Sequence, residues 1–82
     1  MDPWTEFDAM VLRLLSDRQA HDRRDIRRTL ARIDRRHVLI SLALHVEAGR
    51  LVEIRDAVRT SYRITGAGLT HLQQPPSFAK AA

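Results

Sequence analysis

The fold is decided by residues 34–52, which read DRRHVLISLALHVEAGRLV. Asp34 can cap a helix, because its carboxylate can accept a hydrogen bond from an unpaired amide of the first turn. The apolar residues that recur four apart, and so share one helix face, are Val38, Leu42 and Val46. Gly49 readily adopts the left-handed conformation that ends many helices, and the residues after it alternate as in a strand. The stretch therefore predicts a helix over about 35–48 that is followed at once by a strand.

A second predicted helix precedes this one and is covered with arginines. Asp22 can cap it. Its apolar face is formed by Ile26, Leu30 and Ile33. Residues 18–21 before it form a polar connection with a short extended piece around Ala20, and a tight turn near 33–34 follows it. Two short helices joined by a tight turn are typical of a helix-turn-helix, whose second helix enters the major groove of DNA.

The start of the chain predicts an amphipathic helix over about 2–17. Pro3 suits the first helical position with Asp2 as the cap, and Thr5 with Asp8 offers a second cap one turn later. Its apolar stripe consists of Trp4, Phe7, Met10, Val11, Leu14 and Leu15. Most of this stripe is expected to be core.

A β-hairpin is predicted after the central helix, with strands over 51–55 and 60–65 and a loop over 56–59. Tyr62 and Ile64 are expected to face inward, since they alternate with polar residues. The loop lacks glycine, so the pattern leaves its turn type open.

The end of the chain predicts a short helix capped by Thr65, then a flexible C-terminal tail over 75–82 that begins with two prolines. We expect residues 1–74 to form one winged-helix domain. Its fold class would be mainly α with a small β-hairpin wing (α+β). The order would be that of a winged helix-turn-helix, with three helices, the hairpin and a fourth helix.

Composition and charge permit a polyanionic partner without requiring one. Fourteen basic residues exceed ten acidic ones, which gives a net charge of +4, and thirteen of the fourteen are arginines. The chain has no cysteine, so disulfides and thiolate metal sites are excluded. The four histidines lack the spacing of metal ligands, and the serines lack a base in a convincing arrangement. We therefore expect neither an enzyme nor a cofactor.

The N-terminus is acidic and amphipathic, unlike a signal peptide, and no apolar run approaches about 18 residues. These features predict a cytoplasmic protein without a membrane partner.

The sequences EAGRLVEI and SYRITGAGLTHL resemble the wing and following helix of bacterial winged-helix regulators. The nearest patterns are those of the multiple-antibiotic-resistance regulators and the phenolic-acid-decarboxylase regulators. The matching residues are Ala48, Gly49, Leu51, Val52, Tyr62, Ile64, Thr65 and Gly68. The resemblance covers about residues 22–72 and implies a transcriptional regulator that binds double-stranded DNA.

The same resemblance indicates which side chains would contact DNA. The residues expected on the reading helix are Arg35, Arg36, His37 and Ser41. Those expected to bind phosphates from the second helix are Arg27, Arg28 and Arg32, and those on or beside the wing are Arg55, Arg59 and Arg63. Arginines near the interleaved acids Asp22, Asp25 and Asp34 could instead form an ordinary solvated surface.

The central helix departs from the family pattern because it is apolar nearly all round. Leu39 and Ile40 stand where such regulators usually have polar residues that read bases, and Leu44 follows. A helix of this kind is usually buried on more than one side. The alternative hypothesis is therefore a winged-helix module that binds a protein partner through Leu39, Ile40 and Leu44.

Regulators of this kind commonly dimerise through their first and last helices, so the resemblance implies a homodimer. The apolar residues expected at a dimer or partner interface are Trp4, Phe7, Leu39, Ile40, Leu69 and Leu72.

Overall fold

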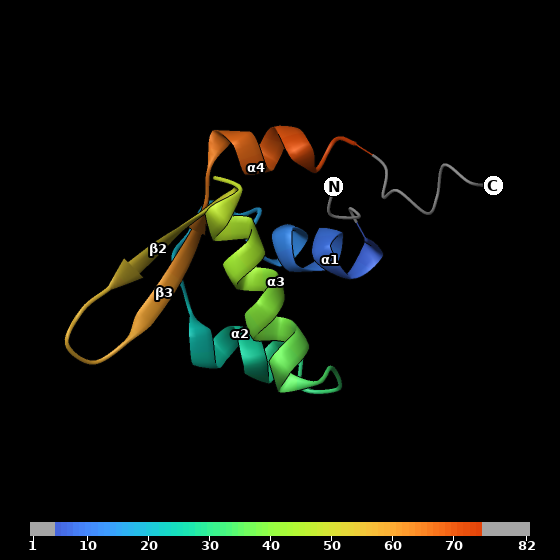
Figure 1. Cartoon of the computed structure of the whole chain (residues 1–82). Helices are drawn as coiled ribbons and strands as arrows, with labels where there is room; N and C mark the ends of the chain where they lie inside the picture. The colour runs from blue at the N-terminus through green and yellow to red at the C-terminus, as the bar shows by residue number, and fades with distance from the viewer. Residues whose placement is uncertain (1–4, 75–82) are drawn as a thin grey trace.

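The computed structural model describes residues 5–74 and arranges them as four helices and three strands (Figure 1). The helices are α1 (Glu6–Leu14), α2 (Arg23–Thr29), α3 (Arg35–Glu47) and α4 (Gly66–His71). The strands are β1 (His21–Asp22), β2 (Leu51–Arg55) and β3 (Thr60–Ile64). The predicted α+β class, with a β-hairpin after the third helix, is confirmed. The predicted tail lies outside the described residues.

Helix α1 is shorter than the predicted helix over 2–17. Thr5 caps it, and a capping box forms with Asp8, whose amide donates to the Thr5 hydroxyl at 3.1 Å. The alternative cap at Asp2 and Pro3 lies outside the described residues. The prediction was wrong at the C-terminal end, because local bonds compete with the helix there: the Ser16 hydroxyl donates to the Arg13 carbonyl at 2.7 Å.

The caps predicted for the two central helices are confirmed. The carboxylate of Asp22 accepts from the Arg24 amide at 2.7 Å, and that of Asp34 accepts from the Arg36 amide at 2.8 Å. Gly49 follows α3 with a φ of 80°, the left-handed conformation expected at that position.

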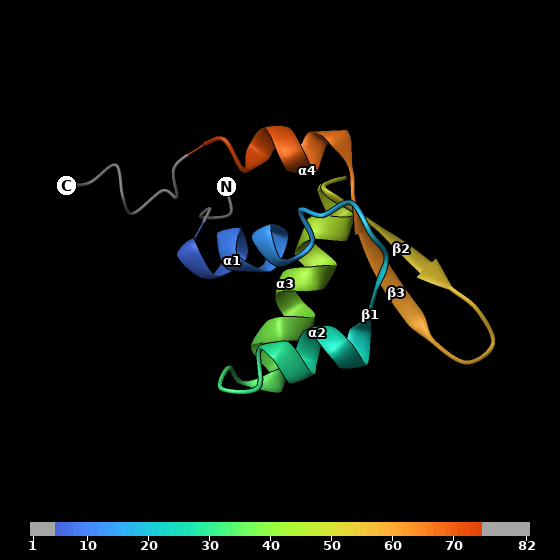
Figure 2. The same cartoon turned by 180° about the vertical axis from the view of Figure 1, so that it is seen from behind.

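The sheet has three antiparallel strands in the order β1-β3-β2, one more than the predicted hairpin. β1 was foreseen only as an extended piece; it pairs with β3 through His21 opposite Tyr62 (Figure 2). Two residues carry no alternating pattern, so pairing over about forty positions could not be read locally. β2 and β3 pair throughout, from Leu51 opposite Ile64 to Arg55 opposite Thr60.

The core lies between α1, α2, α3 and the inner face of the sheet. Tyr62 and Ile64 face inward, as predicted. The other buried apolar residues are Ala9, Val11, Leu12, Leu15, Ile26, Leu30, Val38, Leu42 and Leu51. Helix α4 approaches the chain after α3 so closely that a Cβ on Gly68 would collide with the Arg50 carbonyl oxygen. Only glycine fits there without a shift.

Candidate functional site

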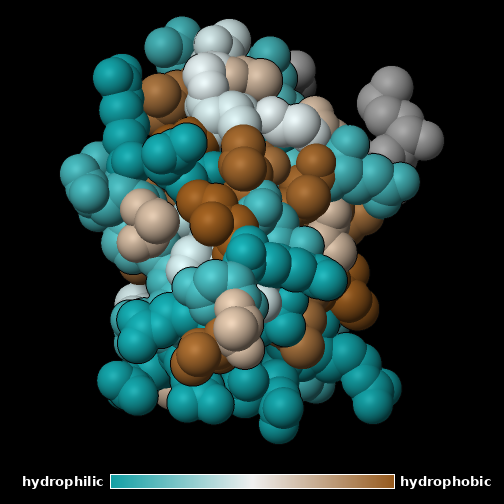
Figure 3. Space-filling model, turned by 90° about the vertical axis from the view of Figure 1, so that its left-hand side faces the viewer, coloured by the Kyte–Doolittle hydropathy of each residue, from teal (hydrophilic) through white to brown (hydrophobic). Residues whose placement is uncertain are grey.

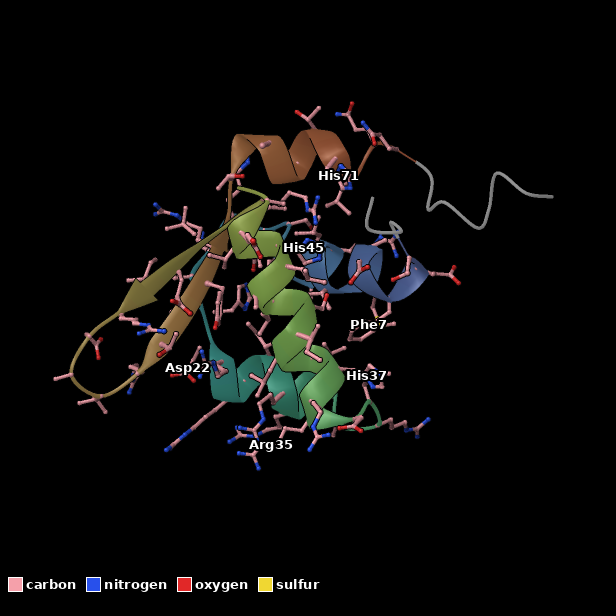
Figure 4. The ribbon with its side chains drawn as sticks, in the orientation of Figure 1. Phe7, Asp22, Arg35, His37, His45 and His71 are labelled. Atoms are coloured by element: carbon pink, nitrogen blue, oxygen red, sulfur yellow. The ribbon has the colours of Figure 1, made fainter. Side chains whose placement is uncertain are left out.

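A groove between α2 and the start of α3 gathers four arginines. Helix α2 supplies three of them at spacings of three and four, so they share one helix face. α3 supplies the fourth in its first turn. These residues, which we call the basic groove, are Arg24, Arg27, Arg28 and Arg35. Figure 4 labels Arg35 among the nitrogen-tipped side chains at this end of the molecule.

The basic groove keeps most of its charge within the part of the chain described. Arg28 has an acidic neighbour, Asp25, at 3.6 Å, and both side chains are largely exposed. Such an exposed pair is weak. Arg24, Arg27 and Arg35 form no direct ion pair with the carboxylates of residues 5–74, although Asp22, Asp25 and Asp56 line a neighbouring groove with Arg24 and Arg27.

The structure brings Arg27, Arg28 and Arg35 together, as expected for one binding surface, and adds Arg24. Arg24 was not among the site residues expected from the sequence, although it lies four positions before Arg28 and so on the same helix face. Arg32 and Arg36 are close in sequence to Arg28 and Arg35 of the groove. Both side chains are exposed, and neither forms an ion pair with a residue of the described range.

Helix α3 presents a solvent face that is mixed rather than basic. Arg36, Ile40, Ala43 and Glu47 are exposed at helical spacing, and His37 is exposed beside them. The expectation that Ser41 contacts DNA is wrong in this structure. Ser41 is 2% exposed, and its hydroxyl donates to Asp8 Oδ1 at 2.7 Å.

The arginines of the hairpin are mostly paired with acids. Arg55 lies 3.0 Å from Glu53, and Arg59 lies 3.8 Å from Asp22 at the start of α2. Arg63 is at the base of the hairpin, where it lines a shallow depression with Arg18. Arg59 lines a groove between the hairpin tip and α2 that also contains acidic residues.

A three-residue contact holds the hairpin against α2. The hydroxyl of Tyr62 accepts from Arg23 Nη2 at 2.7 Å and donates to Glu53 at 3.1 Å. Burial raises the pKa of Tyr62, and the neighbouring guanidinium opposes that shift. The contact joins α2, β2 and β3, so the hairpin is fixed relative to the basic groove. No local sequence signal predicted it.

A buried polar cluster joins α1 to α3. His45 is 0% exposed, and its Nε2 lies 3.1 Å from the carbonyl oxygen of Asp8. Arg50 Nε donates to His45 Nδ1 at 2.8 Å. Burial, together with the charge of Arg50, lowers the pKa of His45 to about 4, so the ring is neutral at neutral pH. The spacing Val38, Ser41, His45 could have placed these polar residues on the buried face of α3.

The apolar residues expected at a partner interface are mostly engaged within the domain. Phe7, Leu69 and Leu72 are half-buried and pack against the core. Leu39 is also half-buried, whereas Ile40 is 51% exposed. Trp4 lies outside the described residues.

Residues 5–74 contain no cluster of acidic residues or histidines arranged to hold a metal ion. None of the helices in that range has the length and apolarity needed to cross a bilayer. No protein-family model, curated protein or solved structure matches the chain.

Proposed function

We propose that this chain is a winged helix-turn-helix protein that binds duplex DNA as a transcriptional regulator. The observation that carries the proposal is the basic groove, where arginines from two successive helices surround one depression and three of the four have no acidic partner within residues 5–74. Guanidinium groups bind phosphate oxygens through two parallel hydrogen bonds, and DNA presents phosphates in regular rows.

The arrangement assigns different parts of the contact to different elements. The basic groove would bind the phosphate backbone and set the orientation of the protein. Arg36 and His37 at the exposed start of α3 would meet base edges, since arginine pairs well with guanine. Arg59 at the hairpin tip would approach a neighbouring phosphate after leaving Asp22.

The test is binding of fluorescently labelled duplex DNA, followed by anisotropy at several salt concentrations. We compare the wild type with Arg24→Gln/Arg27→Gln and with the control Arg13→Gln/Arg18→Gln, which removes the same charge from exposed positions outside the groove. The groove variant should bind at least tenfold more weakly than the control. Equal binding by the two variants would show that only net charge matters and would refute the assignment of the groove.

A second candidate function is binding of a protein partner through α3. It is favoured by one observation: Ile40 exposes half of its side chain at the centre of the solvent face of α3. A wild-type protein that binds no duplex even at low salt would favour this function. Affinity capture with the wild type and with Ile40→Ser, which should fold equally well, would then reveal partners that depend on this residue.

A further inference from the structure

We propose that two copies of this chain associate through the free edge of β2, so that their sheets join into one. This surface differs from the helical interface expected from sequence, and the proposal does not depend on DNA binding. It rests on the backbone of β2, on its side chains and on the charges that one pairing register brings together.

The backbone of β2 has hydrogen-bonding groups that no other strand uses. β2 is the last strand in the order β1-β3-β2. The Asp56 amide donates to the Arg59 carbonyl at 3.1 Å and the Thr65 amide to the Arg50 carbonyl at 3.0 Å. Bonded pairs alternate along an antiparallel ladder, so the amides and carbonyls of the odd-numbered residues between these points face outward.

The side chains of β2 leave this edge unprotected. Val52 and Ile54 project from the outer face of the sheet and are 42% and 39% exposed. Figure 3 looks onto this side of the molecule and shows apolar side chains near its centre. The strand contains no proline, lysine or bulge, three of the devices that keep edge strands apart, and its two charged residues, Glu53 and Arg55, are of opposite sign. Figures 1 and 2 both show the hairpin extending beyond the helices, which leaves its outer half accessible.

Charge selects one antiparallel register for the two copies. With Ile54 opposite the partner's Ile54, Glu53 stands opposite the partner's Arg55, and Arg55 opposite the partner's Glu53. Glu53 also lies 3.0 Å from Arg55 of its own strand, so the four charges alternate in sign across the edge. The outward backbone groups of Glu53 and Arg55 then form the bonded pairs, while the isoleucines occupy the closer non-bonded position. Sliding one strand by two residues relative to the other places Glu53 opposite the partner's Glu53. Like charges directly opposite each other are unfavourable. The favoured occupant of this edge is therefore a second copy of the chain.

The experiment is sedimentation equilibrium of the full chain without DNA over a wide range of concentration. The wild type should show a monomer–dimer equilibrium. Arg55→Glu, which sets acids against acids across the edge, should raise the dissociation constant at least tenfold, and so should Ile54→Lys. Arg13→Glu changes the charge equally on α1 and should leave the constant unchanged.

Mixing two variants provides the decisive test. Arg55→Glu and Glu53→Arg should each remain monomeric, whereas an equimolar mixture should associate, because each copy then faces opposite charges. Circular dichroism first verifies that Glu53→Arg folds, since Glu53 also binds Tyr62. A wild type that stays monomeric at all concentrations would overturn the proposal, and so would dimers that tolerate Arg55→Glu. The variant Arg24→Gln/Arg27→Gln should dimerise like the wild type. The DNA-binding proposal can therefore fail without affecting the dimer proposal.

Discussion

Arg50 Nε lies 2.8 Å from Nδ1 of His45, and this distance determines where the imidazole carries its proton. A guanidinium can only donate, so Nδ1 must accept, and Nε2 carries the hydrogen that points to the carbonyl of Asp8. A second proton on the ring would have to occupy the nitrogen that faces Arg50. The buried ring is therefore held neutral by geometry as well as by burial.

The first prediction concerns acid stability. The pKa of His45 is about 4 in the folded chain against 6.5 in the unfolded chain, so the unfolded state binds more protons between these values. The contribution of the neutral His45 ring to the free energy of unfolding is fully present above about pH 6.5 and is lost as the pH falls towards 4. The loss should reach roughly 3 kcal/mol, because each pKa unit corresponds to about 1.4 kcal/mol. Urea unfolding at pH 7.5, 6, 5 and 4 measures it.

The control variant is His37→Gln, which makes the same change of residue type at an exposed position. His45→Gln should flatten the pH profile. The pKa of His71 is also lowered by burial, so His71 adds a change in the same direction that His45→Gln would leave in place. A profile identical in wild type and His45→Gln would contradict the assignment.

The second prediction concerns the approach of α4 to the chain after α3. Gly68→Ala should destabilise the fold by about 1–3 kcal/mol, because the new Cβ would meet the Arg50 carbonyl and lie 2.7 Å from Ile64 Cγ1. Gly66→Ala in the same helix meets nothing within 4 Å and should be neutral or stabilising. Thermal unfolding of the two variants compares them directly; equal effects would mean that α4 can shift away.

The third prediction concerns the hydroxyl of Ser41. Ser41→Ala should cost about 1–3 kcal/mol, because it removes a buried hydrogen bond to the charged carboxylate of Asp8. Burial raises the pKa of Asp8, but the hydrogen bonds from Ser41 and Thr5 together lower it more, so loss of the Ser41 hydroxyl should raise this pKa. Ser16→Ala, at an exposed position, is the matched control and should change the unfolding free energy by less than about 0.5 kcal/mol. A larger loss in the control would contradict this ranking.

The fourth prediction concerns the salt dependence of DNA binding. Each phosphate contact contributes about 0.9 to the slope of log affinity against log salt concentration. Arg24→Gln/Arg27→Gln should therefore reduce the slope by about 2, uniformly across duplex sequences. Arg36→Gln should instead alter the preference among sequences. A groove variant with an unchanged slope would mean that these arginines contact no phosphate.

The parts of the fold that could be predicted from sequence depend on local chemistry. Asp22 and Asp34 cap helices because their carboxylates reach amides two positions away. Gly49 ends α3 by its own conformational freedom. The alternation of Tyr62 and Ile64 gives their inward orientation because a strand has a period of two.

The parts that could not be predicted depend on contacts between distant segments. The pairing of β1 with β3 and the contact of Arg23 with Tyr62 each join residues about forty positions apart. The burial of Ser41 depends on where α1 packs. In the candidate site, helix periodicity could have grouped Arg24 with Arg27 and Arg28, whereas the ion pairs of Arg55 and Arg59 emerged only in three dimensions.

The backbone hydrogen bonds of Arg50 have a consequence for the cooperativity of unfolding. Its amide donates to the His45 carbonyl at 2.8 Å and its carbonyl accepts from the Thr65 amide at 3.0 Å, so α3, the sheet and the start of α4 share one residue. These amides should exchange with solvent deuterium only when the whole unit opens. The Val58 and Arg59 amides at the hairpin tip, bonded to the Asp56 carboxylate, should exchange earlier through local opening. The hairpin would thus fray from its tip while its base unfolds only with the domain.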